Sequence, residues 1–196
     1  MSNNVKETAN LQKVITGVVR LSYANLWQPK SINGGKEKYS VSLIIPKSDK
    51  VTLAKIKAAT EAAYQEGQTK LKGNGKTVPP LATLKTPLRD GDAERPEDEA
   101  YADSYFVNAN SDTAPGIVDI NRQPITDHSE IYSGAYARAS INFYAYNAGG
   151  ASRGIACGLS NIQKVRDGES LGGKSKAEDD FNDDFVYEDD DEDFLS

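Results

Sequence analysis

The sequence predicts a mainly β domain with one main helix, long loops and a disordered acidic C-terminal tail. Short segments rich in Val, Ile and Tyr alternate between polar and apolar residues, which is typical of half-buried strands. Residues 48–66 instead repeat their apolar residues at helical spacing. The end of the chain is too acidic to form a core. We therefore expect a flexible N-terminus (1–10), a folded domain (11–173) and a tail (174–196).

The first two predicted strands are separated by a loop. Residues 11–23 (LQKVITGVVRLSY) favour a strand that is partly apolar on both faces. Residues 24–37 contain Pro29 and an Asn-Gly-Gly sequence, which indicate a loop. Residues 38–46 (KYSVSLIIP) alternate cleanly and end at a proline, so they are predicted as the second strand.

The main helix follows this second strand. Ser48 or Asp49 can cap it, and it is expected to end near Glu66, before Gly67. Residues 68–103 contain seven glycines and prolines and are predicted as a long irregular excursion.

Four further segments complete the domain. Residues 104–109 and 116–120 are predicted as short strands. Residues 134–147 (GAYARASINFYAYN) and 153–165 are predicted as a hairpin that turns at the adjacent glycines 149 and 150. Five or more strands with one main helix favour a five-stranded Greek-key barrel of the oligonucleotide-binding type (OB-fold) over a sandwich.

The 134–147 strand carries the most informative surface. Its outward face combines an arginine with three tyrosines: Tyr136, Arg138, Tyr144 and Tyr146. Exposed rings on a strand can stack bases of any sequence, and the arginine can meet a phosphate. A second interpretation stays open, in which the tyrosines pack under a loop or at a dimer interface.

Basic and aromatic residues also interleave around the first loop, as expected of a flap over a nucleic-acid backbone. These are Tyr23, Trp27, Lys30, Lys36, Lys38 and Tyr39. Trp27 can equally anchor the loop into the core. Further candidate phosphate contacts are Arg20, Lys85, Arg89, Arg153, Lys164 and Arg166.

The charge is unevenly distributed along the chain. Residues 177–196 hold eleven acids and no base, so a net charge of −6 conceals a body of +5. A tail of acids and aromatic rings resembles a polyanion whose rings mimic bases, so it can compete with DNA or dock on partners. The residues expected to do this are Phe181, Phe185, Tyr187, Asp190, Asp191 and Phe194.

Composition excludes several function classes. One Cys and one His rule out an internal disulfide and the usual zinc sites. Residues 73–77 (GNGKT) resemble the end of a phosphate-binding loop, but Lys70 stands where that loop needs its first glycine. No nucleotide cofactor is therefore expected. We expect no catalytic residue, metal, cofactor or membrane-spanning segment. Asp119, Asp127 and Glu130 leave a metal-dependent nuclease open as a minor alternative.

Four segments together resemble a known family. They are LSYANLWQPKSINGGKEKYSVSLIIPKSD (21–49), LKTPLRDGD (84–92), YSGAYARASINFYAYN (132–147) and GIACGLSNIQKVRDGESLGG (154–173). They are similar to the phage single-stranded DNA-binding proteins of siphovirus-type replication modules, distantly similar to the T7 type. The resemblance implies an OB-fold, no enzymatic activity, and a role in phage DNA replication, recombination or repair in the host bacterial cytoplasm. Phe194 departs from the T7 pattern because two residues follow it.

The sequence therefore predicts a sequence-independent single-stranded DNA-binding protein. Its lysines and arginines are expected to neutralise phosphates, and its aromatic rings to stack on nucleobases. Its tail is expected to compete with DNA and to recruit replication proteins such as a polymerase or a helicase. Binding of double-stranded DNA and formation of a homodimer stay open. The alternatives are a protein–protein adaptor that acts through the tail and, less favoured, the nuclease.

Overall fold

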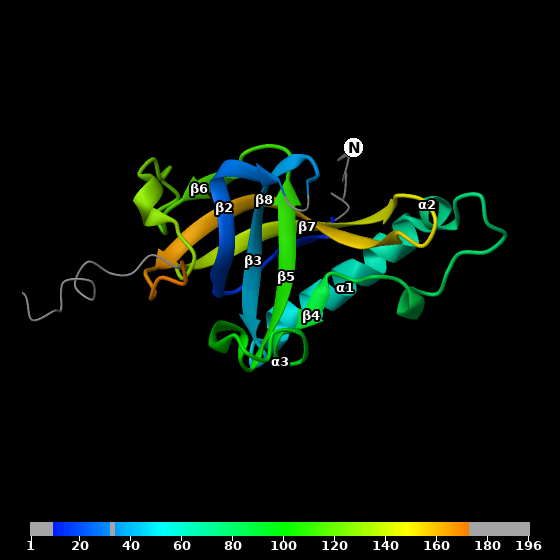
Figure 1. The fold of residues 1–196 in the computed structure, drawn as a ribbon, viewed down its shortest axis with the longest axis horizontal. Helices are drawn as coiled ribbons and strands as arrows, with labels where there is room; N and C mark the ends of the chain where they lie inside the picture. The colour runs from blue at the N-terminus through cyan, green and yellow to red at the C-terminus, as the bar shows by residue number, and fades with distance from the viewer. Residues whose placement is uncertain (1–9, 32–33, 173–196) are drawn as a thin grey trace, which may run out of the picture.

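The computed structural model describes residues 10–31 and 34–172 (Figure 1). Residues 1–9 of the predicted flexible N-terminus and the whole predicted tail lie outside the described residues. Part of the predicted Asn-Gly-Gly turn, at residues 32–33, also lies outside them.

The described residues form one eight-stranded sheet with few helices, which agrees with the predicted mainly β class. The strands are β1 (Lys13–Ile15), β2 (Val19–Ser31), β3 (Glu37–Pro46), β4 (Leu88–Asp90), β5 (Ser104–Ser111), β6 (Gly116–Val118), β7 (Tyr136–Asn147) and β8 (Arg153–Arg166). The pairings run β7–β2–β3–β5–β8, and β8 pairs back with β7. Five strands therefore close a circuit, and β1, β4 and β6 attach to its members.

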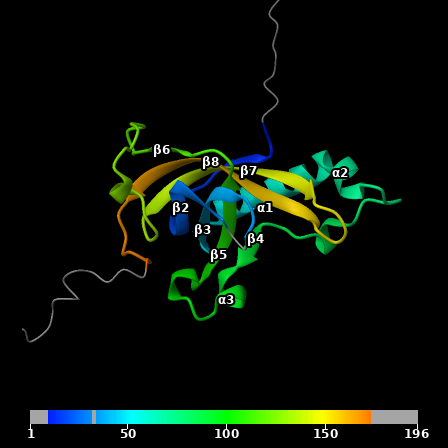
Figure 2. The ribbon, with the colours of Figure 1, turned by 45° about the horizontal axis from the view of Figure 1, so that its top comes forward.

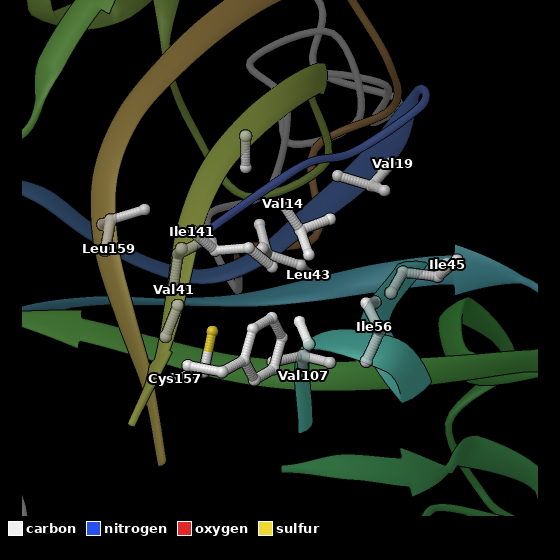
Figure 3. Close-up of a cluster of buried hydrophobic side chains, with 14 of the residues drawn as sticks. Val14, Val19, Val41, Leu43, Ile45, Ile56, Val107, Ile141, Cys157 and Leu159 are labelled. Carbon is white, nitrogen blue, oxygen red and sulfur yellow. The ribbon is translucent and has the colours of Figure 1, made fainter. Parts of the chain in front are cut away.

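The strands of this circuit contribute most of the hydrophobic core (Figure 3). β7 contributes Phe143 and Ile141 with three small alanines, and β3 and β8 contribute alternate residues to the same core. The inward residues of these strands are Val41, Leu43, Ile45, Ala137, Ala139, Ile141, Phe143, Ala145, Ile155, Cys157 and Leu159. Their burial confirms the inward residues predicted for the three strands, and the opposite face of β3 is buried too at Ser40, Ser42 and Ile44.

The helix α1 (Lys50–Glu66) begins and ends where the sequence predicts. The carboxylate of Asp49 accepts a hydrogen bond from the Thr52 backbone N–H (3.1 Å), and the Gly67 N–H donates to the Ala63 carbonyl (2.9 Å). Its buried face passes through Leu53, Ile56, Ala59 and Ala63, whereas Val51 is 66% exposed.

The first predicted strand is two strands, and the predicted loop after it is largely strand. Gly17 interrupts the first segment, because its N–H donates to the Thr52 hydroxyl on α1 (2.8 Å) instead of to the sheet. β2 then continues to Ser31 and passes through Pro29. The β2–β3 register shifts on both sides of Asn25, and these irregularities accommodate a proline that cannot donate to the ladder.

The long excursion contains short elements. They are α2 (Gln68–Lys72), η1 (Leu81–Thr83), β4, α3 (Gly91–Glu94) and η2 (Glu99–Tyr101). Figures 1 and 2 show the β7–β8 hairpin projecting toward α2, and α3 lying at the opposite end of β3 and β5 from β6. In the part of the chain that the structure describes, no helix is long and apolar enough to cross a bilayer.

Residues 90–103, which hold seven acids and one base, fold against the outer side of the sheet, and we call them the acidic flap. The ring of Tyr101 packs edge-on against Phe106 at 5.1 Å and is fully buried. Its hydroxyl hydrogen-bonds the Ser42 hydroxyl at 2.9 Å. Ile44 completes this small outer cluster. The flap is therefore a packed part of the domain.

Candidate nucleic-acid interface

A groove crosses the outer face of β2, β3 and β5. Its floor consists of side chains that alternate with core residues along β3 and β5, and these side chains are small or uncharged. The lining residues are Tyr23, Asn25, Lys30, Ser31, Ser40, Val41, Ser42, Arg95, Asn108, Ala109 and Asn110. Its lining includes two cations, Lys30 of β2 and Arg95 of residues 90–103.

A second hollow continues from this groove. Asn108 of β5 lines both, so the two hollows adjoin at this residue, and we call them together the path. The second hollow is lined by Lys85, Thr86, Pro87, Arg89, Glu94, Asn108, Tyr146, Ile155 and Ala156. The path thus brings together candidate residues that lie more than 100 positions apart in the chain.

Tyr144 and Tyr146 stand on the outward face of β7 beside this path. The Tyr144 side chain lies near Gly158 of β8. A Cβ at position 158 would be 3.6 Å from the Tyr144 ring and 4.0 Å from the Asn110 carbonyl, which places the ring next to the groove floor. Burial raises the pKa of the Tyr144 phenol, so this group stays neutral. Tyr144 is nevertheless 38% exposed, and its ring is available to a ligand.

Three predicted lysines gather at the β2–β3 tip. Lys30 lies opposite Lys38 in the β2–β3 register. Lys36 and Lys38 approach the carboxylate of Asp112 at 3.3 and 4.0 Å. These pairs are exposed and therefore weak, so a phosphate can displace the carboxylate. Tyr39 has the same strand parity as the core residue Val41 and is half-buried, which directs it away from the groove.

The opposite end of β7 is arranged differently. The guanidinium of Arg166 lies 3.8 Å from the centre of the Tyr136 ring, and that of Arg20 lies 5.5 Å from it. Arg20 also donates to the backbone carbonyls of Gly134 (3.2 Å) and Glu169 (2.7 Å). Tyr136, Arg20 and Arg166 therefore contact one another, and the groove does not include them.

Three other predicted cations hold the fold together. Lys164 is 11% exposed and lies 2.7 Å from carboxylate oxygens of both Glu130 and Asp167. Arg153 donates to the Leu71 carbonyl at the end of α2 (2.9 Å). Arg138 donates from Nε to the Thr16 carbonyl (3.1 Å), which leaves the outer part of its guanidinium exposed.

Trp27 is half-buried against the core. Its ring stacks on His128, with the ring centres 4.3 Å apart and the planes 8° from parallel. Its Nε1–H donates to the Ile131 carbonyl (3.4 Å). The geometry thus favours the interpretation in which Trp27 anchors its segment, and the ring lies outside the groove.

The acids considered for a metal site are occupied by other contacts. Asp119 accepts from the backbone N–H groups of Asn121 and Gln123. Asp127 accepts from the hydroxyl and backbone N–H of Ser129, and these hydrogen bonds lower its pKa. Within residues 10–31 and 34–172, no three His, Cys, Asp or Glu side chains gather as metal ligands would.

The groove also contains residues that the sequence reasoning missed. Asn108 and Asn110 alternate with core residues on β5, so the strand parity could have identified them. Ser40 and Ser42 share that property on β3. Arg95 is the only base within the acidic flap. Its position in the groove depends on tertiary folding and had no sequence signal.

Comparisons with known proteins identify the family of this chain. The family model of the single-stranded DNA-binding protein of Enterobacter phage Enc34 matches residues 12–195. Protein p50 of Acyrthosiphon pisum secondary endosymbiont phage 1 is 30% identical over 169 residues, covering 82% of this chain and 87% of that protein.

Solved structures of phage proteins share the fold. The C-terminally truncated single-stranded DNA-binding protein of bacteriophage Enc34 matches with a TM-score of 0.67 and 22% identity, over 82% of this chain and 88% of that chain. The same phage protein in complex with single-stranded DNA matches at 0.63 and 22%, over 82% and 90%. The bacteriophage T7 single-stranded DNA-binding protein gp2.5 matches at 0.58 and 13%, over 84% and 97%.

Proposed function

Because the chain belongs to the family of the Enterobacter phage Enc34 single-stranded DNA-binding protein, we propose that it binds single-stranded DNA without regard to sequence. The family is one of DNA-binding proteins and not of enzymes. The match over residues 12–195 carries this proposal, and the groove gives it a location. The biological setting that we propose is phage DNA replication, recombination or repair in the host bacterial cytoplasm.

The closed circuit of five strands supports a finer assignment of the fold. In it, β5 and β8 are parallel, whereas the other four pairings are antiparallel. This arrangement favours a Greek-key barrel of the OB type, in which the outer face of the second and third strands binds oligonucleotides. With β2 counted as the first strand of the circuit, β3 and β5 are the second and third, so the groove over β2, β3 and β5 lies on the corresponding face.

The chemistry of the groove suits a single strand. Tyr144 and Tyr146 offer ring faces at one end, and Tyr23 is 58% exposed at the other. Stacking on such rings tolerates any base and contributes roughly 1–3 kcal/mol per base. The lysines at the β2–β3 tip, with Lys85, can neutralise phosphates and release counterions.

The acidic tail supports a second part of the proposal. Its acids and rings, from Phe181 to Phe194, lie outside the described residues, so the argument rests on composition. We propose that the tail competes with DNA for the groove and that, once displaced, it recruits replication proteins such as a polymerase or a helicase. Deletion of residues 177–196 should then tighten DNA binding and abolish recruitment, whereas equal or weaker affinity would contradict the competition.

One gel-shift experiment tests the proposed function. Single- and double-stranded oligonucleotides are offered to the full chain, with and without Mg²⁺. We expect retardation of the single strand without cleavage, and affinity that falls as salt rises. Retardation of the duplex would show that double-stranded DNA is also bound. Absence of any retardation would favour the adaptor, and cleavage on adding Mg²⁺ would favour the nuclease.

A further inference from the structure

We propose that Arg95 is a phosphate-binding residue of the groove, held in place by three aromatic rings and supplied by the acidic flap. This inference rests on the proposed function and extends it, because Arg95 lies in a segment whose net charge argues against contact with DNA. It assigns the flap a role in binding DNA.

The Arg95 guanidinium is surrounded by aromatic rings. Its central carbon lies 5.1 Å from the centre of the Tyr23 ring, 5.0 Å from that of Tyr101 and 5.2 Å from that of Phe106. An arginine in such a cage keeps its charge, because ring faces attract cations without neutralising them. The three rings come from β2, the flap and β5, so the cage forms only in the folded domain.

Arg95 lacks the carboxylate partner that its neighbours have. Arg89 forms a double hydrogen bond with Glu94, and Lys47 lies 2.9 Å from Asp90 and 2.7 Å from Asp92. Over the part of the chain that the structure describes, no carboxylate oxygen lies within 4.0 Å of the Arg95 guanidinium.

The hydrogen-bonding capacity of Arg95 is largely unused. Its Nε is buried and makes no hydrogen bond within the described structure. Its Nη1 makes only a long contact with the Tyr23 hydroxyl, at 3.5 Å. A guanidinium has five N–H donors and matches the oxygens of a phosphate well. An anion that enters the groove can therefore be bound by the terminal Nη groups of this guanidinium.

The backbone around Arg95 is held rigidly. Its N–H donates to the Gly91 carbonyl (2.9 Å), and its carbonyl accepts from Asp98 (3.1 Å). A Cβ at Gly91 would lie 2.4 Å from the Tyr101 carbonyl oxygen, so only glycine fits there. The Asp92 carboxylate accepts from the Asp103 N–H (3.0 Å) and ties the two ends of the flap together. The guanidinium is thus positioned before any ligand binds.

Tyr23 completes the site. It has a positive φ of 46° at an irregularity of β2, an unusual backbone conformation for a tyrosine. One side of its ring faces Arg95, and the residue is 58% exposed. A single nucleotide can therefore place its phosphate on Arg95 and its base on the open face of Tyr23.

The test compares R95Q, R95K and the control R122Q in the full chain. Arg122 is an exposed arginine outside the groove, so R122Q removes the same charge elsewhere. Binding of fluorescent oligo(dT) is measured over a range of KCl concentrations. We expect R95Q to weaken binding at least ~10-fold and to reduce the log–log salt slope by about 0.7. R95K should retain the slope but bind more weakly, since lysine lacks the planar fork. R122Q should change neither quantity.

The outcomes distinguish a failure of this inference from a failure of the proposed function. If the parent protein fails to bind oligo(dT), the proposed function is wrong. If the parent binds and R95Q behaves like R122Q, or loses affinity with an unchanged slope, Arg95 contacts no phosphate and the inference is wrong. If R95Q does not fold, the parent's arginine Nε–H NMR signals decide, with the Arg95 signal assigned by its loss in R95K. DNA should shift that signal, and an unshifted signal would overturn the inference.

Discussion

Replacing Tyr144 and Tyr136 separately with alanine should give opposite results, although both residues lie on the outward face of β7. Tyr144 has an exposed ring beside the groove, whereas the ring of Tyr136 lies against two guanidiniums. We expect Y144A to lose DNA affinity and keep its stability. We expect Y136A to lose stability and keep most of its affinity.

The magnitudes follow from these contacts. The Tyr144 ring can stack one base, which contributes roughly 1–3 kcal/mol, so Y144A should bind about 5- to 150-fold more weakly. Tyr136 makes two cation–π contacts, with Arg166 at 3.8 Å and with Arg20 at 5.5 Å. Each contributes about 0.5–1 kcal/mol at a partly exposed site, so Y136A should lower the free energy of unfolding by about 1–2 kcal/mol. That loss corresponds to a Tm decrease of roughly 2–8 °C.

The assay pairs fluorescence anisotropy of labelled oligo(dT) with thermal unfolding of the same samples. Y144F serves as the control, because it keeps the ring and removes only the hydroxyl, and it should bind like the parent. Equal affinities for Y144A and the parent would place the Tyr144 ring outside the DNA path. A large affinity loss in a stably folded Y136A would show that DNA displaces the two arginines from that ring, and the argument from covered rings would fail.

Three further predictions concern the fold. Burial raises the pKa of the Cys157 thiol, so iodoacetamide should label it only after unfolding in urea. F143A should lower the free energy of unfolding by about 3–5 kcal/mol in a urea titration, because the ring is fully buried. Hydrogen bonds from Lys47 lower the pKa values of Asp90 and Asp92 below 3.8. Their stabilisation is complete above that value and disappears as pH falls through the lowered pKa values, so K47M should flatten the acid-side loss of Tm.

The elements predicted correctly are those whose signals are local. The alternation of β3, β7 and β8 reflects the one face of each strand that enters the main core, which the sequence records at every second residue. The ends of α1 depend on Asp49 and Gly67, which act within one turn of the helix. The path of β2 through Pro29 was not predictable in this way, because its pairing with β3 tolerates two shifts of register.

The residues of the candidate site also differ in whether a local sequence signal identifies them. Tyr144 and Tyr146 were identified from strand parity, and the structure places them beside the groove. The same parity gave no means of distinguishing Tyr136. Its ring is covered because the β7–β8 register sets it opposite Arg166, 30 residues later, and because Arg20 approaches from β2. Because this contact joins side chains from three strands, the sequence of no single strand predicts it.

The acidic flap shows why summed charge is a poor guide to what a surface binds. Three of its seven acids, Asp90, Asp92 and Glu94, pair with Lys47 and Arg89, so part of its negative charge is compensated within the fold. The Asp98 carboxylate accepts a hydrogen bond from the Ala100 backbone N–H at the start of η2 and so stabilises the flap as well. The one base of the flap, Arg95, reaches the groove without a carboxylate partner among the described residues. A segment that is acidic in sequence can therefore present a cation to the ligand, because three of its acids pair with other cations and none of the described carboxylates pairs with Arg95.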